Sequence, residues 1–403
     1  MWTARLFSLA AFAALVLACC GCQSDALAID ATIQSRHLPY GGILDPIFAT
    51  PTGSDITGYT RCGDSALWTG HYLAAESYRY AVTSDPAALA NAQAALAHLK
   101  TLVDVTGTGL LARCVVPINS PYAAGITSEE SANGIHESGA NYWIGHTSRD
   151  AYMGVFFGLS VAYDLLGSST QPAIQALATR MLNFLIANSW GVVMPDGSIS
   201  TTFLIRPDEQ LGVLQLGRHV NSEQFASTYQ SAASLGSLLA AIPVGVDAGD
   251  VRDSYFKFNL DAINLFSLIR LETDSTLLAR YQAAYQIYWN AVQSHMNAHF
   301  NMIDRALNGP DTARDSATAA YLFEWLQRQR RDFHVDLTGQ YPSCVNSGES
   351  CAPLPIPQRV PDQFLWQISP FQLDGGGSGL IEGTGIDYIL PYWMARYYGL
   401  IND

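Results

Sequence analysis

GDSALWTG, residues 63–70, is the stretch that decides what this sequence predicts about fold and chemistry. TSRDAYMG, residues 147–154, follows the same plan. Each places a carboxylate, Asp64 or Asp150, in a turn just before a long stretch rich in Ala, Gly and aromatic residues. A helix start gathers unpaired backbone N–H groups and positive dipole potential. Each carboxylate is therefore expected to be either a helix cap or a reactive group held in place.

Helical periodicity extends outward from these two starts. Residues 65–83 and 87–105 form the first predicted pair of helices, and Pro86 between them suits the first turn of a new helix. The same pattern returns along the chain and predicts successive αα-hairpins. Further helices are expected at 150–166, 172–189, 208–216, 222–242, 253–271, 275–299, 312–330 and 387–400.

Three stretches lack this periodicity. Residues 25–60 are rich in Gly, Pro, Thr and Ser and are expected to form an extended lead-in. Residues 115–147 and 332–382 are long and irregular, and each leads into a helix that carries a motif. Structureless loops beyond ~15 residues are uncommon unless they are functional or disordered. The predicted organisation is a leader at 1–22, a lead-in at 23–62 and a single domain at 63–403.

Successive helical hairpins suggest an all-α fold in which the pairs close into an α/α toroid. In this respect the chain resembles the (α/α)6-barrel carbohydrate-active proteins, a broad group of six-hairpin glycosidases, related lyases and sugar epimerases. The resemblance implies a glycan-processing cleft at one end of a barrel. It matches no single activity, so it carries over no catalytic residues. The segments that carry it are 63–80, 105–113, 148–164 and 389–397.

The N-terminus indicates export. The apolar run from Leu6 to Ala18 is too short for a membrane-spanning helix but suits a secretory signal. The cysteines that follow resemble a bacterial lipoprotein signal, in which the lipidated cysteine becomes the mature N-terminus. Cys19 fits best by the residues before it and Cys22 by those after it, while ordinary secretion with cleavage nearby is the alternative. No later segment is expected to be long and apolar enough to span a bilayer.

Four further cysteines are expected to form disulfides, because an even number in an exported chain favours pairing. Cys344 and Cys351 lie close together in a loop and are predicted to form a local bridge. Cys62 and Cys114 would then join the loop before one helix to the loop after the next. Zinc binding is disfavoured because the CxxC spacing is absent.

The net charge and the aromatic content of the chain indicate which classes of molecule it could bind. The net charge of −14 argues against binding nucleic acid or anionic lipid through charge. Uncharged polar ligands fit better, and the 20 Tyr and 8 Trp are consistent with stacking on sugar faces, although core packing also uses such residues. An oligosaccharide or polysaccharide is the expected partner, and no cofactor or metal is expected.

Three carboxylates are the candidate catalytic groups. A glycosidase needs an acid together with a base or nucleophile, and most families use carboxyl groups for both. Asp64 and Asp150, at helix starts, suit the base or nucleophile role unless burial raises one pKa. Glu382, among glycines and outside a helix start, is the predicted general acid, and a plain turn with a solvated Glu is the alternative.

Other polar and aromatic side chains near these motifs are the candidate substrate contacts. Trp68 and His71 share a helix face with Asp64, although a packing histidine is the alternative for His71. A lyase or epimerase acting on a uronic acid would need a His or Tyr base and an Arg for the substrate carboxylate, while structural ion pairs are the alternative for each Arg. The remaining candidates are Arg113, His136, His146, Arg149, Tyr152, Asp387 and Arg396.

The sequence therefore favours an exported, lipid-anchored bacterial protein that hydrolyses a glycan by carboxylate acid/base chemistry. A uronic-acid lyase or epimerase is the second hypothesis. A glycan-binding surface lipoprotein without turnover is the third.

Overall fold

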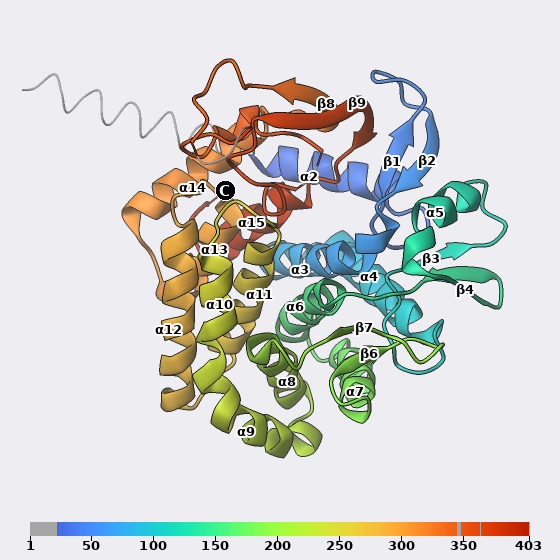
Figure 1. Cartoon of the computed structure of the whole chain (residues 1–403), viewed down its shortest axis with the longest axis vertical. Coiled ribbons are helices and arrows are strands. Elements are labelled where there is room, and N and C mark those ends of the chain that lie inside the picture. Colours follow the sequence, from blue (N-terminus) through green and yellow to red (C-terminus); the bar gives the residue numbers. More distant parts are fainter. Residues whose placement is uncertain (1–21, 345–347, 363, 403) are drawn as a thin grey trace, which may run out of the picture.

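The computed structural model describes residues 22–344, 348–362 and 364–402 (Figure 1). Helices account for most of the ordered chain, and their order follows the hairpins expected from the sequence closely. The α-helices are α2 (Cys22–Thr32), α3 (Ser65–Thr83), α4 (Pro86–Asp104), α5 (Ala123–Glu129), α6 (Arg149–Leu165), α7 (Gln171–Ala187), α8 (Pro207–Val220), α9 (Ser222–Leu239), α10 (Ala241–Ala248), α11 (Lys257–Arg270), α12 (Ser275–Val292), α13 (Ala298–Asn308), α14 (Thr312–Trp325) and α15 (Ile386–Tyr397).

Six of these helices pack in sequence around the core. Within α3, α6 and α11 nearly every residue of the middle turns is buried. Each helix in the order α3, α6, α8, α11, α13, α15 contacts the next, and α15 contacts α3. Helices α4, α7, α9, α12 and α14 alternate with them along the chain.

The six core helices run in the same direction. At one end, His71 of α3 contacts Asn259 of α11 and the ring of His299 of α13. At the other end, the hydroxyls of Tyr78 and Tyr398 lie 3.3 Å apart. The starts of the helices therefore meet at one end of the molecule, and we refer to this as the N-terminal end of the core helices.

The α3–α6 contact is unusually close because glycines form it. A Cβ added at Gly70 would lie 2.1 Å from the carbonyl oxygen of Gly154, and one added at Gly158 would lie 2.2 Å from the carbonyl oxygen of Gly70. Only a residue without a side chain allows two helix backbones to approach this closely. This contact sets the spacing between the helices that begin next to Asp64 and Asp150.

The prediction of an all-α fold is wrong. The structure is 56% helical, and within the described residues nine strands form three antiparallel sheets. The strand orders are β2-β1-β9-β8, β3-β5-β4 and β6-β7. The strands are β1 (Asp45–Phe48), β2 (Ile56–Thr60), β3 (Cys114–Pro117), β4 (Ile135–Ser138), β5 (Asn141–Ile144), β6 (Gly191–Val193), β7 (Ile199–Thr202), β8 (Arg331–Asp336) and β9 (Asp374–Glu382).

Most of the strands arise in the three stretches that lacked helical periodicity, whereas the β6–β7 hairpin lies between two predicted helices. β3, β4 and β5 lie within the first long irregular stretch, and β8 and β9 lie within the second. Figure 1 shows β1, β2, β8 and β9 gathered along one side of the helices. These strands are mostly short, and β9 begins with glycines, so alternation of polar and apolar residues did not mark them.

Residues 23–62 are ordered rather than an extended lead-in. They contain α2, a π-helical turn at Ile33–His37, β1 and β2. Ion pairing holds α2 in place, because Arg79 of α3 donates to Asp30 at 2.6 Å. Further along, the backbone N–H of Ile43 donates to Thr69 near the start of α3. The segment therefore runs antiparallel to α3.

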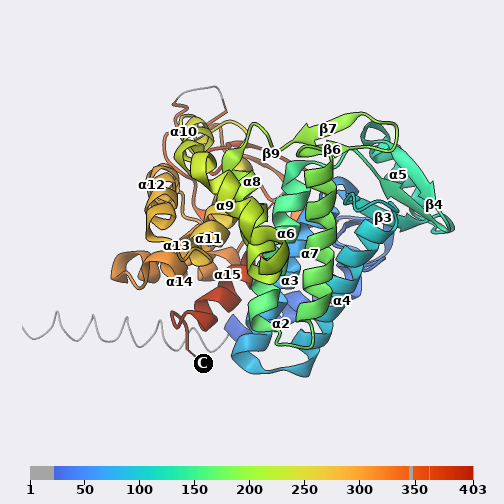
Figure 2. The same ribbon diagram turned by 90° about the horizontal axis from the view of Figure 1, so that it is seen from below.

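The start of α2 lies at the end of the molecule opposite the starts of the core helices. Gln23 accepts a hydrogen bond of 2.8 Å from Arg396, near the end of α15. Figure 2 shows α2 and the C-terminus toward one end, and α10 and the β6–β7 hairpin toward the other. A helix of 19 residues such as α3 is about 28 Å long, which separates the two ends.

Both expected disulfides are present. Cys62 pairs with Cys114, with 5.5 Å between the Cα atoms, and Cys344 pairs with Cys351. The first bridge joins the turn before α3 to β3 and so fixes the backbone next to Asp64. Cys19, one candidate for lipidation, lies outside the described residues, and Cys22, the other, begins α2.

One helical stretch overturns the expectation that no later segment could span a membrane. Ser222–Ala248, which comprises α9 and α10, reaches a mean hydropathy of 1.4, and 22% of that window is buried. Its buried side, which includes Phe225, Tyr229 and Ala233, packs into the core, so part of this hydropathy serves the fold. Core helices of soluble proteins meet the same length and composition criteria.

Candidate active site

Asp64 and Asp150 line one cavity at the N-terminal end of the core helices. Its volume is about 20 Å³, room for about one water molecule. The walls come from four segments that are far apart in the sequence: the start of α3, the start of α6, the start of α11 and the loop before β9. The lining residues are Asp64, Leu67, Trp68, Asp150, Phe256, Asn259, Leu260 and Gln367.

Neither carboxylate caps its helix. Asp64 occupies the position before α3 but makes no capping hydrogen bond. The cap of α6 is Ser148, whose hydroxyl accepts from the N–H of Ala151, and this leaves Asp150 in the first turn. The capping alternative is therefore wrong for both residues, and their side chains are available to the cavity.

Asp64 is held by neutral and positive groups. Gln367 donates to its Oδ2 at 3.3 Å, and a guanidinium nitrogen of Arg113 lies 3.9 Å from its Oδ1. Arg113 is itself anchored, because it donates to the carbonyl oxygens of Gly63 and His146 at 2.9 Å each. The Asp64 side chain remains 35% exposed, which is consistent with a carboxylate on the wall of a cavity.

Burial raises the pKa of both carboxyl groups. For Asp64, desolvation outweighs the positive charge of Arg113 and the hydrogen bond from Gln367, so the pKa is raised. For Asp150, desolvation is again the main cause, and the negative charge of Asp64 raises the pKa further against Arg149 and Arg113. The effect of burial thus exceeds the stabilisation that a helix start offers an ionised acid. The two groups are electrostatically coupled and differ in their stabilising partners.

Trp68 lines the cavity, but His71 lies beneath it. The His71 ring is fully buried, and its nitrogens contact the carbonyl oxygen of Leu67 at 2.9 Å and the amide of Asn259 at 3.2 Å. Burial lowers the pKa of His71 to about 4, so the ring is neutral at ordinary pH. A direct role for His71 in binding a ligand within the cavity is not supported by this placement.

A buried network of acids and arginines lies behind Asp150. Arg149 is 2.7 Å from Glu209, and Arg206 donates to Asp208 and Asp261 at 2.9 Å each. Burial is the main reason that the pKa values of Glu209 and Asp261 are raised. Neighbouring carboxylates raise them further, and the arginines oppose this effect. The acids at the start of α8 belong to this network, and no side-chain hydrogen bond caps that helix.

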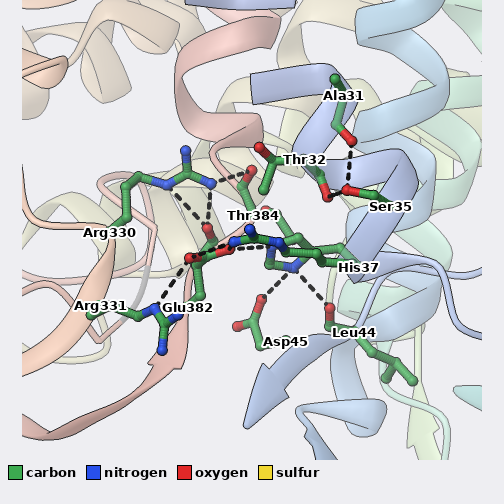
Figure 3. Close-up of polar contacts among 12 residues, drawn as sticks. Ala31, Thr32, Ser35, His37, Leu44, Asp45, Arg330, Arg331, Glu382 and Thr384 are labelled. Atoms are coloured by element: carbon green, nitrogen blue, oxygen red, sulfur yellow. Dashed lines mark hydrogen bonds and ion pairs between the residues drawn. The ribbon is translucent and has the colours of Figure 1, made fainter. Parts of the chain in front are cut away.

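Glu382 lies in a different cluster, shown in Figure 3. Its carboxylate is 3.1 Å from Arg331, 3.2 Å from Arg36 and 3.7 Å from His37. Burial alone would raise its pKa, but the contact with His37 and the charges of Arg330 and Arg36 outweigh burial and lower the pKa to about 2. A carboxyl group that stays ionised cannot act as a general acid near neutral pH. This environment does not favour Glu382 as a general acid, and its ion pairs join β9 to the segment after α2.

Three other candidates are internal contacts of the fold. The hydroxyl of Tyr152 accepts from the N–H of Leu111 and is fully buried. Asp387 is buried, faces Arg328 at 3.4 Å and accepts from the N–H of Leu365 at 3.0 Å. Arg396 binds Gln23 at the opposite end of the molecule. Tyr152, Asp387 and Arg396 are therefore engaged within the fold and do not line the cavity.

The remaining candidates lie near the cavity without lining it. Arg149 donates to Thr201 and Thr202 of β7 as well as pairing with Glu209. His136 stacks on Trp143 within the β3-β5-β4 sheet, with ring centroids 4.1 Å apart. His146 is exposed in the turn before α6, with a φ of 43°. None of these three groups is part of the cavity lining.

Sequence reasoning missed several residues that line the cavity, and three of them are aromatic or polar. Phe256 and Asn259 belong to the start of α11, and Gln367 belongs to the long loop before β9. All three are uncharged, so no pattern of titratable groups marked them. Within the described part of the chain, no cluster of His, Cys, Asp and Glu could hold a metal ion.

Comparison with known proteins gave no assignment. No family model matches this chain, and no curated protein matches it. The resemblance to (α/α)6-barrel carbohydrate-active proteins therefore stays a prediction, and the argument for function depends on the site itself.

Proposed function

We propose that this protein is an exported glycoside hydrolase whose acid/base pair is Asp150 and Asp64. The observation that carries the proposal is that two carboxylates from distant helix starts, neither of them a cap, line one cavity beside Trp68. Paired carboxyl groups around a scissile bond are the usual machinery of glycoside hydrolysis.

The environments of the two groups assign their roles. Asp150 is the general acid, because burial and the neighbouring negative charge of Asp64 both favour its protonated form. Asp64 is the base or nucleophile, because Gln367 and Arg113 stabilise its ionised form. Both pKa values are raised, so the assignment depends on the difference between the two surroundings: Gln367 and Arg113 favour the ionised form of Asp64, whereas the charge of Asp64 favours the protonated form of Asp150.

The acid would give its proton to the glycosidic oxygen as the bond to the sugar breaks. The ionised partner would then activate water or form the bond to the anomeric carbon. Trp68 and Phe256, which line the cavity, would supply apolar faces for the sugar ring. Phe256 is 42% exposed, as suits a contact residue at an entrance.

Elimination or epimerisation has less support. Those reactions need a His or Tyr base and a cation for a uronic-acid carboxylate. Among the described residues, the cavity lining includes no His, Tyr or Arg. Arg113 is close to Asp64, but its guanidinium group already donates hydrogen bonds to two backbone carbonyl oxygens.

The site of action is the second part of the proposal. The two disulfides favour an oxidising, exported environment. We place the protein in the bacterial cell envelope, attached through a lipid on Cys19 or Cys22, because of the signal-like sequence before α2.

A panel of polysaccharides and oligosaccharides with product analysis tests the activity. We expect new reducing ends without unsaturated products, and we expect Asp64→Asn and Asp150→Asn each to lower turnover by at least about 100-fold while the protein stays folded. Asp55→Asn, at an exposed site in the turn between β1 and β2, is the matched control and should retain full activity. Unsaturated products, or full activity in both cavity variants, would contradict the proposal.

A further inference from the structure

Trp366 fills the centre of the molecule just below the cavity. Its side chain is 1% exposed. The indole lies with its ring centre 4.3 Å from that of His299, 5.3 Å from that of His71 and 6.1 Å from that of Trp68, to which it is nearly parallel. We call the space bounded by Trp68, His71, Asn259 and His299, and occupied by this indole, the inner chamber.

The polar groups of the inner chamber lack partners. Both ring nitrogens of His299, Oδ1 of Asn259 and Nε1 of Trp366 have no hydrogen-bond partner among the described residues. His299 is 1% exposed and Asn259 is 2% exposed. Unmade hydrogen bonds of buried groups are costly, so four in one place call for an explanation. The indole has a single donor, which reaches neither the imidazole nor the amide here, whereas a hydroxylated ring offers several donors and acceptors.

The segment that carries Trp366 is held by few polar contacts. Residues 364–368 form a turn in which Phe364 accepts from Gln367 and Ile368. Two hydrogen bonds tie this turn to the core helices, from the N–H of Leu365 to Asp387 and from Gln367 to Asp64. One of the two thus ends on a carboxylate of the candidate active site. A substrate that engages Asp64 would compete with the contact that keeps the turn in place.

We propose that the inner chamber is a binding subsite for an uncharged pyranose ring, and that the Trp366 indole occupies it until substrate displaces the 364–367 turn. A pyranose has an apolar face for Trp68 and hydroxyl groups that both donate and accept, which Asn259 and His299 require. A charged sugar is disfavoured because the chamber holds neutral histidines and no counter-ion. This inference rests on the proposed function for its ligand class.

Binding measurements test the subsite without requiring turnover. Trp366→Ala empties the inner chamber and removes the competing ring. We expect calorimetric titration with glucose, galactose, mannose and N-acetylglucosamine to give, for at least one sugar, a Kd at least 10-fold lower in Trp366→Ala than in the native protein. Adding His299→Ala to the same protein should raise that Kd at least 10-fold. Trp325→Ala is the matched control, because Trp325 is also buried with an unpartnered Nε1 but lies in α14, outside the inner chamber.

Each outcome decides the proposal. A folded Trp366→Ala protein that binds none of the four sugars more tightly than the native protein overturns it, as does equal tightening in Trp325→Ala. If Trp366→Ala does not fold, Gln367→Ala replaces it, since this change removes only the hydrogen bond to Asp64. Tighter sugar binding then supports the subsite, and an unchanged Kd overturns it. Tight binding by a protein that hydrolyses no glycan would reject the proposed function and leave the subsite intact.

Discussion

Asp64 and Asp150 show that burial, rather than helix position, decides the protonation of this acid pair. Both lie where a helix dipole favours the ionised form. The structure encloses them in a cavity, and desolvation raises both pKa values. Their hydrogen-bond partners then distinguish the two carboxyl groups, since only Asp64 accepts a hydrogen bond from the side-chain amide of Gln367. The proposed assignment of acid and base therefore depends on tertiary contacts that neither motif contains.

The pH dependence of activity should show the difference in protonation between Asp64 and Asp150. We expect kcat/KM to follow a bell-shaped curve whose acidic limb is the ionisation of Asp64 and whose basic limb is the loss of the Asp150 proton. Arg113→Lys should move the acidic limb to higher pH, because a less well-placed charge stabilises the Asp64 carboxylate less. The rates are to be measured from pH 3 to 9. An acidic limb that stays in place would mean that Arg113 does not tune Asp64.

Glu382 gives a second prediction at this scale. Its pKa of about 2 lies below the ordinary value of 4.5, so its ion pairs stabilise the folded protein above that value, and this stabilisation is lost as pH falls toward 2. Glu382→Gln should lower the free energy of unfolding by roughly 2–3 kcal/mol at pH 7. Urea unfolding at several pH values measures this difference, which should shrink below pH 4.5. Glu137→Gln, at an exposed site, is the control, and an equal loss in both variants would count against the assignment.

At the scale of elements, the glycine contact between α3 and α6 sets the active-site geometry. Gly70→Ala and Gly158→Ala place a methyl group against the backbone of the neighbouring helix, so each should destabilise the protein by about 3 kcal/mol. They should also lower activity, since separating the helices moves Asp64 away from Asp150. Gly125→Ala in α5 is the control, because its added Cβ meets no atom within 4 Å and its change in stability should stay within about 0.5 kcal/mol. Thermal and urea unfolding compare the three.

Helices were predictable from this sequence and strands were not. The stretch 65–83 matches α3 because apolar side chains recur at helical spacing and because a serine and a proline follow its last residue. The helix predicted at 275–299 runs past the end of α12, and most of α13 was not predicted as a helix. The sheets depend on pairing between distant segments, such as Ile47 with Ile381, and such pairing leaves no local signal.

The candidate site was predictable in part for the same reason. Two carboxylates at aromatic-rich helix starts carry a local pattern, so Asp64 and Asp150 could be singled out. Glu382 also carried a pattern, glycines on both sides, but its neighbours Arg36 and Arg331 come from remote segments and fix its charge. Gln367 and Phe256 became visible only when the fold brought their segments to the cavity.

For the whole molecule, the two disulfides should differ in their contribution. Cys62 and Cys114 are 52 residues apart, and Cys344 and Cys351 are 7 apart. The cost of closing a loop in the unfolded chain predicts a loss of about 4 kcal/mol for Cys62→Ala with Cys114→Ala, and about 2 kcal/mol for the shorter bridge. Urea unfolding of the two double variants measures both values. Equal losses would show that native contacts, rather than loop closure, dominate.

The position of α2 has a consequence for how the cavity would be oriented relative to a membrane. Its first turn lies beside the end of α15, about one long helix away from the cavity. A chain tethered to a bilayer ahead of α2 would hold the N-terminal end of the core helices, which carries the cavity, away from the lipid headgroups. Under the proposed function and anchor, such an orientation would favour polymers of the surrounding wall or medium over sugars still carried on lipids of the same leaflet.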